Sequence, residues 1–153
     1  ILGLFISLLS RAVHIPVVTW FLHNFERTDD LKIFPGKGAL FFFAGSIIAL
    51  YMYGVQIASA CILILAVGDS INVLIGKPFG KIPNPLHSKK MIEGSIAGFI
   101  ASFIVASFFV PLMPAIIASA VAMLIESIDF GRLQINDNVL IPVFAGMVLY
   151  FLI

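Results

Sequence analysis

The sequence predicts an all-α, polytopic transmembrane helix bundle, and three observations lead to this prediction: composition, apolar runs and the distribution of charge. Hydrophobic residues make up 61% of the 153 residues and charged residues only 11%, with a mean hydropathy of +1.12. Soluble domains carry roughly 25% charged residues, so this chain lacks the polar surface that water requires. Because a helix needs about 20 apolar residues to cross the hydrocarbon core, we expect about five or six spans in one integral membrane domain.

Five apolar runs set the order of the expected helices. They cover residues 38–54, 55–76, 93–111, 114–130 and 139–153. Polar residues interrupt the first 25 positions, which therefore form either one broken span or the end of a span followed by an interfacial segment. A charge such as Arg11 is costly at mid-membrane, which favours the second interpretation. The single domain is expected to cover residues 1–153. Because the sequence begins at Ile1 rather than at Met, either processing or partial coverage is expected, and partial coverage would leave further spans upstream.

The charged residues lie in alternate joints between these runs. The joints near 54–56 and 110–114 carry no charge, whereas segments 26–37, 77–92 and 131–138 carry nearly all of it. Alternate joints of a bundle share one side of the membrane, and the positive-inside rule makes the basic side cytoplasmic. The basic residues expected there are Arg27, Lys32, Lys37, Lys77, Lys81, Lys89, Lys90 and Arg132.

Two pairs of polar residues lie inside the expected spans, near the basic side. Asp69 precedes Gly76, the end of its run, by seven residues, which places it roughly 10 Å below the cytoplasmic surface, and Asn72 shares its helix face. Glu126 and Asp129 have the same spacing near the end of another run. An ionised acid that faces lipid costs several kcal/mol. A structural ion pair explains one such acid, whereas two acids on different spans favour a shared Mg²⁺.

The segment between the second and third runs combines glycines with lysines. Gly76 and Gly80 allow close backbone approach, and a helix predicted to open over residues 88–94 offers its N-terminal amides to an anion. Four lysines suit a polyphosphate: Lys77, Lys81, Lys89 and Lys90. The segment is not a Walker A loop, because it lacks the Gly-x-x-x-x-Gly-Lys-Ser/Thr pattern. The alternative is an ordinary cytoplasmic loop that is basic because of topology alone.

Other polar and small residues have structural interpretations. Glu93 favours the start of the third helix, and Asp137 or Asn138 is suited to cap the last one. Gly94 and Gly98 lie four residues apart and predict close packing of two helices.

An ordered set of motifs resembles the CTP-dependent polyprenol kinase family, which includes dolichol kinase, phytol kinase and the yeast-type diacylglycerol kinase. The central motif is Gly68-Asp69-Ser70, Ile75-Gly76, Phe79-Gly80-Lys81 and Lys89-Lys90-Met91-Ile92-Glu93-Gly94-Ser95. The flanking motifs are Pro35-Gly36-Lys37-Gly38, and Glu126 followed by Asp137-Asn138 and Ile141-Pro142. The resemblance covers roughly residues 26–145.

This resemblance implies transfer of the γ-phosphoryl group of CTP to the hydroxyl of a membrane lipid alcohol. Asp69, Glu126 and Glu93 are the expected catalytic and Mg²⁺-binding residues, and a carboxylate among Asp69, Glu126 and Asp129 is expected to take the hydroxyl proton. CTP is expected to contact the lysines and their neighbours: Ser70, Asn72, Gly76, Lys77, Gly80, Lys81, Lys89, Lys90, Gly94, Ser95, Asp137 and Asn138.

Alternatives from other classes remain. The same layout resembles the CDP-lipid synthases, although Gly68-Asp69-Ser70 and Asp137-Asn138 look more like the kinases. A transporter would be expected to show inverted repeats and a midplane site, and a structural subunit would not need the glycine- and lysine-rich segment. The expected location is a prokaryotic plasma membrane or the endoplasmic reticulum, with the site facing the cytoplasm. The net charge of +1 gives no reason to expect nucleic acid, and a homodimer is left open.

Overall fold

The computed structural model describes residues 37–128 and 136–153. The chain divides into two compact units, Ile1–Phe43 and Ala44–Ile153. The described part of the first unit is the start of helix α4, where the rings of Phe42 and Phe43 meet edge to face with centroids 5.9 Å apart. The second unit holds the rest of α4 and all other described elements.

The described residues are almost entirely helical, which confirms the predicted all-α class. The helices are α4 (Lys37–Phe79), α5 (Ile92–Ala106), α6 (Leu112–Glu126) and α7 (Asp137–Leu152). Two short strands, β1 (Pro83–Asn84) and β2 (His87–Met91), form an antiparallel hairpin between α4 and α5. Within the described ranges, only α4 is long and apolar enough to cross a membrane, and α5, α6 and α7 are apolar but shorter. The expected five or six spans are therefore not established.

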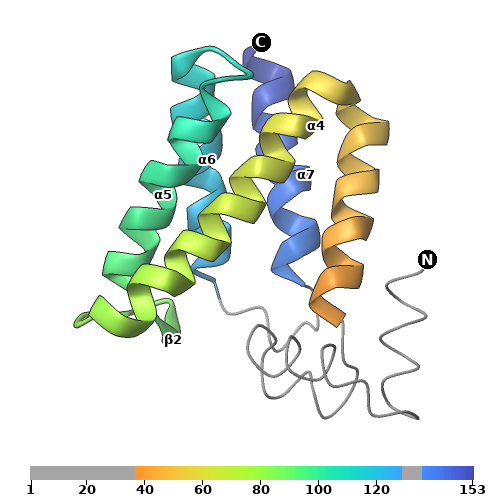
Figure 1. Ribbon diagram of the computed structural model, residues 1–153. Helices are drawn as coiled ribbons and strands as arrows, with labels where there is room; N and C mark the ends of the chain where they lie inside the picture. Colours follow the sequence, from red (N-terminus) through yellow and green to blue (C-terminus); the bar gives the residue numbers. More distant parts are fainter. Residues whose placement is uncertain (1–36, 129–135) are drawn as a thin grey trace, which may run out of the picture. The chain divides into compact units, whose positions relative to one another are not determined.

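Helix α4 consists of two arms joined at Gly54. This residue has φ 73° and ψ 173°, a conformation that glycine adopts without the steric penalty of a Cβ. The first arm (residues 37–53) and the second arm (residues 55–79) run in different directions from this point (Figure 1). The predicted joint between the first two apolar runs is thereby confirmed.

Glycines bring the second arm of α4 against α5. A Cβ placed on Gly94 would lie 2.9 Å from the Cα of Gly76, and one placed on Gly98 would lie 2.8 Å from the carbonyl oxygen of Gly68. The Ser102 hydroxyl in α5 also donates to the Ile64 carbonyl oxygen in α4, at 3.1 Å. The predicted close packing at Gly94 and Gly98 is confirmed.

Helix α7 packs in the same way against the first arm of α4. A Cβ on Gly45 would overlap the carbonyl oxygen of Asn138, and a Cβ on Gly146 would overlap the ring of Tyr53. The Tyr53 hydroxyl donates to the Val143 carbonyl oxygen at 2.8 Å. Helix α6 lies between α5 and α7 and contacts both. The core of this unit is therefore built on small residues that let helices approach closely.

The segment predicted as a polar loop at 77–92 instead contains the hairpin. The Asn84 side chain accepts a hydrogen bond from the Leu86 backbone N–H at 2.9 Å, which stabilises the turn between the strands. Met91 pairs with Pro83 and is itself extended, with φ −114°. Helix α5 consequently begins at Ile92, inside the segment 88–94 over which a helix was predicted to open, while residues 88–91 belong to strand β2.

Candidate functional site

Charged residues from several elements meet at one end of the second unit. Glu126 is the last residue of α6, and its side chain is 1% exposed. Lys90, on strand β2, donates to the Glu126 carboxylate oxygen Oε1 and, at 2.6 Å, to the Glu126 carbonyl oxygen. The Lys90 ammonium also lies 3.6 Å from Oδ2 of Asp137, the first residue of α7. Lys90 therefore connects the hairpin to the last residue of α6 and the first residue of α7.

Asp69 reaches the same group of charges from the second arm of α4. Its carboxylate, like that of Asp137, interacts electrostatically with Glu126. We refer to Asp69, Glu126, Asp137 and Lys90 as the acidic cluster. Three carboxyl groups thus share a single ammonium group. This imbalance favours binding of a further cation.

Two buried side-chain atoms, one within the acidic cluster and one facing the glycines of α5, have no hydrogen-bond partner among the described residues. They are Oε2 of Glu126 and Nδ2 of Asn72, whose side chain is 4% exposed. Asn72 lies three residues after Asp69 and so shares its helix face. A third such atom, Oγ of Ser119, lies midway along α6. An unpaired buried polar atom costs about 1–3 kcal/mol, so this end of the unit is suited to a polar or charged ligand.

The acidic cluster fits Mg²⁺ only with few protein ligands. Among residues 37–128 and 136–153, no three or more acidic, histidine or cysteine side chains are grouped so that they could hold a metal. Mg²⁺, however, is commonly bound by one or two carboxylates together with substrate phosphates and water. The unpaired Oε2 of Glu126 and the nearby Asp69 carboxylate satisfy this smaller requirement.

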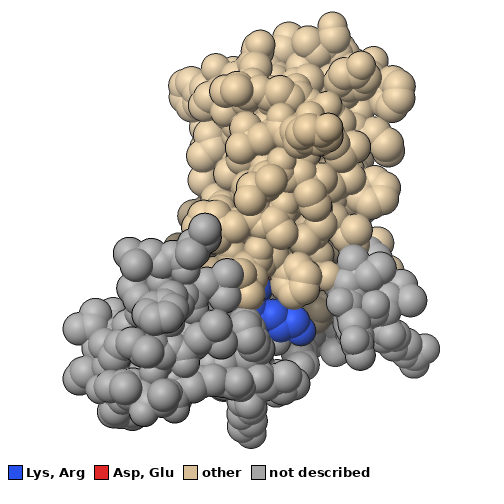
Figure 2. Space-filling model, turned by 90° about the vertical axis from the view of Figure 1, so that its right-hand side faces the viewer, with Lys and Arg blue, Asp and Glu red and all other residues tan. Residues whose placement is uncertain are grey.

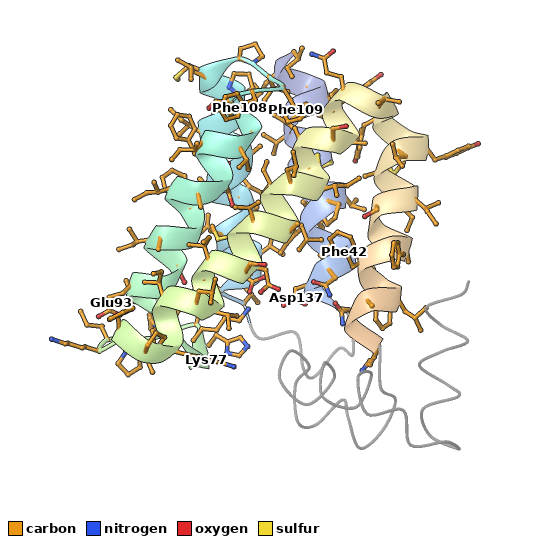
Figure 3. All side chains as sticks on the ribbon, in the orientation of Figure 1. Phe42, Lys77, Glu93, Phe108, Phe109 and Asp137 are labelled. Atoms are coloured by element: carbon orange, nitrogen blue, oxygen red, sulfur yellow. The ribbon has the colours of Figure 1, made fainter. Side chains whose placement is uncertain are left out.

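Glu93 has a different role from the other predicted metal ligands. Its Oε1 accepts hydrogen bonds from the backbone N–H groups of Lys81 and Ile82, at 2.9 and 3.2 Å. Glu93 therefore links residues 81 and 82, directly before strand β1, to the first turn of α5. The second arm of α4 separates Glu93 from Asp137 in Figure 3.

The four predicted phosphate-binding lysines differ in their surroundings. Lys77 and Lys81 are exposed, and Lys77 lies in the last turn of α4, at the charged end of the unit (Figure 3). Lys90 is engaged in the acidic cluster. The side chain of Lys89 lies outside the described part of the structure. Of the four lysines, Lys77 and Lys81 therefore remain exposed.

Most of the smaller predicted contact residues have structural partners. The Ser70 hydroxyl donates to the Ala66 carbonyl oxygen of its own helix, at 2.7 Å, and Ser95 donates to Met91, at 3.3 Å. The Gly80 N–H donates to the Gly76 carbonyl oxygen at 3.1 Å, at the end of α4. The close approach allowed by these glycines thus serves helix and hairpin packing.

The last helix is capped by a residue for which the sequence alone predicts no role. Asn136 accepts a hydrogen bond from the Asn138 backbone N–H at 2.9 Å, so Asn136 is the N-cap and the prediction of Asp137 or Asn138 as the cap is wrong. Asp137 Oδ1 also accepts from that N–H, at 3.1 Å. Asn84, which shapes the hairpin turn, is likewise unpredicted, although the Asn84-Pro85 dipeptide is a turn signal.

Some predicted residues lie outside the described ranges. They are Asp129, the Pro35-Gly36 part of the flanking motif, and the basic residues Arg27, Lys32 and Arg132. The chain matches no protein-family model, and neither a curated protein nor a solved structure shows significant similarity to it.

Proposed function

We propose that this chain is an integral membrane enzyme that transfers the γ-phosphoryl group of CTP to the hydroxyl of a lipid alcohol. One observation carries the proposal. The acidic cluster joins carboxylates from three helices and a lysine from the hairpin at one end of an otherwise apolar unit. Phosphoryl transfer requires mainly positioning and neutralisation of charge, which such a group of residues is suited to provide.

The membrane location is supported by the surface of the helices. Large apolar side chains are exposed along them, including Tyr51 at 93%, Phe108 at 80% and Phe151 at 77%. Exposed apolar area on this scale is unfavourable in water and favourable in lipid. The proposal extends to a bundle of about five or six spans whose charged end faces the cytoplasm of a prokaryote or of a cell with an endoplasmic reticulum.

Each charged residue has a part in the proposed mechanism. The exposed ammonium groups of Lys77 and Lys81 bind the CTP phosphates. Asp69 and Glu126 would hold Mg²⁺, which would neutralise phosphate charge. Lys90 fixes the Glu126 carboxylate through Oε1 and leaves Oε2 without a hydrogen-bond partner among the described residues. The carboxylate of Asp69 or Glu126 accepts the proton of the lipid hydroxyl as the oxygen bonds to the γ-phosphorus, the bond from that phosphorus to the β,γ-bridging oxygen breaks, and CDP leaves.

The identity of the donor and acceptor rests on the motif resemblance. The central motif from Gly68 to Ser95 supplies the second arm of α4, the hairpin and the start of α5, and Glu126 and Asp137 supply the remaining acids. The acceptor class comprises polyprenols such as dolichol, phytol-like alcohols and diacylglycerol.

The direct test is incubation of the purified protein in lipid micelles with γ-labelled CTP and a panel of these alcohols. Labelled lipid phosphate is the expected product. Asp69→Asn should abolish it, and Ser107→Ala, at the opposite end of α5, is the matched control. A CDP-lipid formed from a phosphorylated lipid would instead identify a CDP-lipid synthase.

Binding provides a second test that does not require the correct alcohol. CTP with Mg²⁺ should raise the midpoint of thermal unfolding in detergent, and should do so more than ATP with Mg²⁺. No shift with either nucleotide would favour a transporter or a structural subunit.

A further inference from the structure

The Lys90 ammonium lies among oxygen atoms of the kind that bind metal cations. Besides Oε1 of Glu126, it contacts the Glu126 carbonyl oxygen at 2.6 Å and lies 3.6 Å from Oδ2 of Asp137. Carboxylate and carbonyl oxygens are also the ligands that Mg²⁺ and Ca²⁺ prefer in proteins. The ammonium group therefore lies where two carboxylates and a backbone carbonyl together offer the ligands of a hard cation.

The end of helix α6 also favours positive charge at this position. Glu126 is the last residue of α6, and the last four carbonyl groups of a helix have no partner within the helix. These carbonyl groups form the negative end of the helix dipole, which attracts cations. A cation is thus favoured here by the helix itself, in addition to the carboxylates.

Water has little access to these charged groups. The side chains of Glu126, Lys90 and Asp137 are 1%, 13% and 15% exposed. On the face drawn in Figure 2, the described surface shows Lys or Arg atoms and no Asp or Glu atoms. A buried carboxylate requires a partner of opposite charge, so removal of the lysine would leave a strong demand for another cation.

Hydrogen bonds to the start of α5 hold the backbone that carries Lys90. Strand β2 pairs with β1, and directly after β2 the Ile92 N–H donates to the Ile82 carbonyl oxygen at 3.0 Å. The Glu93 carboxylate accepts from the backbone N–H groups of residues 81 and 82. The fold therefore positions the lysine before any ligand binds.

We propose that the Lys90 ammonium is a built-in cation, which occupies a divalent-cation site and prevents metal from binding there. Glu126 then serves two cations: Oε1 pairs with the lysine, and Oε2, which has no partner among the described residues, is left for Mg²⁺. With Asp69 as its other protein ligand, Mg²⁺ would bind only when nucleotide phosphates supply further oxygens. The inference rests on the proposed function, because it assigns the cations of the same site.

The test is binding of Mn²⁺, an ion that also prefers oxygen ligands, in the absence of nucleotide. The full chain is purified in detergent, and free Mn²⁺ is measured by electron paramagnetic resonance as the metal is added. Lys90→Met empties the proposed site, and Lys90→Met/Glu126→Gln also removes its carboxylate. Lys77→Met is the matched control, because it removes the same charge from an exposed lysine at the same end of the unit.

Lys90→Met should bind Mn²⁺ at least about tenfold more tightly than the wild-type chain or Lys77→Met, because cation affinity depends on the charge of the site. The additional Glu126→Gln substitution should abolish this gain. Mn²⁺ should also raise the midpoint of thermal unfolding of Lys90→Met and leave that of the wild-type chain unchanged, because an ion stabilises only a folded state that binds it. Lys90→Gln, whose amide retains a donor for Glu126, is tested in the same way in case Lys90→Met does not fold.

Four results would overturn the proposal. Lys90 variants that bind Mn²⁺ no better than the wild-type chain, or that fail to fold even with Mn²⁺ present, would show that metal does not replace the lysine. An equal gain in Lys77→Met would show a general effect of charge. Tight binding by the wild-type chain would show that the lysine does not exclude metal. None of these results depends on transfer of label from CTP to lipid, so this inference and the proposed function can fail separately.

Discussion

The charged and charge-free ends of the second unit are built from the same four helices but satisfy their polar groups differently. At the charged end, polar contacts join residues far apart in sequence, and Glu126 and Asn72 retain buried atoms without partners among the described residues. At the charge-free end, which residues 51–56 and 107–113 form without any charged residue, the N–H groups of residues 107–110 donate to carbonyl oxygens of α5, and the Gln56 side chain donates to the Phe109 carbonyl oxygen. The first arrangement suits a polar ligand, whereas the second is local pairing at the end of a helix and between two neighbouring turns.

The largest expected effect is on the chemistry of the charged end. Glu126→Gln keeps the shape of the side chain but removes the charge that pairs with Lys90. Phosphoryl transfer should fall by about 10²–10³-fold, the usual effect of losing one preorganised electrostatic group. The measurement is the initial rate with saturating CTP. Unchanged activity would mean that the acidic cluster is a structural ion-pair network, whereas Ser107→Ala should retain full activity in either case.

The next effect concerns stability at the same end. Lys90→Met leaves the buried Glu126 carboxylate without its counter-charge and should lower the free energy of unfolding by about 3 kcal/mol. Unfolding by SDS in mixed micelles, followed by circular dichroism, measures this loss. The double variant Lys90→Met/Glu126→Gln should recover part of it, because both charges are then absent. A loss that the second substitution does not relieve would show that Lys90 acts through packing.

Glycine substitutions compare the packing of the two ends directly. Gly94→Ala puts a Cβ 2.5 Å from the Asn72 carbonyl oxygen and should cost about 2 kcal/mol through overpacking. Gly54→Ala meets no atom within 4 Å, but its φ of +73° should cost about 1 kcal/mol. Thermal unfolding in detergent should therefore rank Gly94→Ala as the less stable protein. The opposite ranking would indicate that the contact between α4 and α5 adjusts easily.

The smallest expected effect is at the charge-free end. Gln56→Leu removes the side-chain donor to the Phe109 carbonyl oxygen. A hydrogen bond between helices in a membrane contributes about 0.6 kcal/mol on average, and a loss of this size is expected in SDS unfolding. Gln56→Glu is a control that also removes the amide donor but adds a charge, so it should cost more if lipid surrounds the turn. Equal stability of the two variants would place the turn in water.

The sequence predicted those features of the site that depend on local spacing. The apolar runs predicted helices, Gly54 lies at the predicted joint, and Gly94 and Gly98 lie at a close helix contact. Asp69 and Glu126 were predicted to meet because the joints alternate, and they interact electrostatically. Whether they bind Mg²⁺ and CTP stays a prediction.

Other features could not be read from spacing. The hairpin replaced a predicted loop because two short strands pair only when the Asn84 turn brings them together. Glu93 lies in the first turn of α5, as predicted, but spacing did not show that its carboxylate also accepts from the backbone N–H groups of residues 81 and 82. Asn136, directly before two other suitable capping residues, became the cap because its backbone is extended, with φ −89° and ψ 130°.

By itself, the sequence determined the helical class, the apolar character of the helices and the presence of acids near one end of two of them, since composition and helical periodicity are local properties. Only the tertiary structure decided which charges meet. Lys90 bonds to Glu126 across 36 positions in the chain and lies 3.6 Å from Asp137. It does so because Lys90 lies on strand β2 of the hairpin, and its side chain reaches the last residue of α6 and the first residue of α7. The partner of a charge depends on distances through space, and these are set when the helices pack on their glycines.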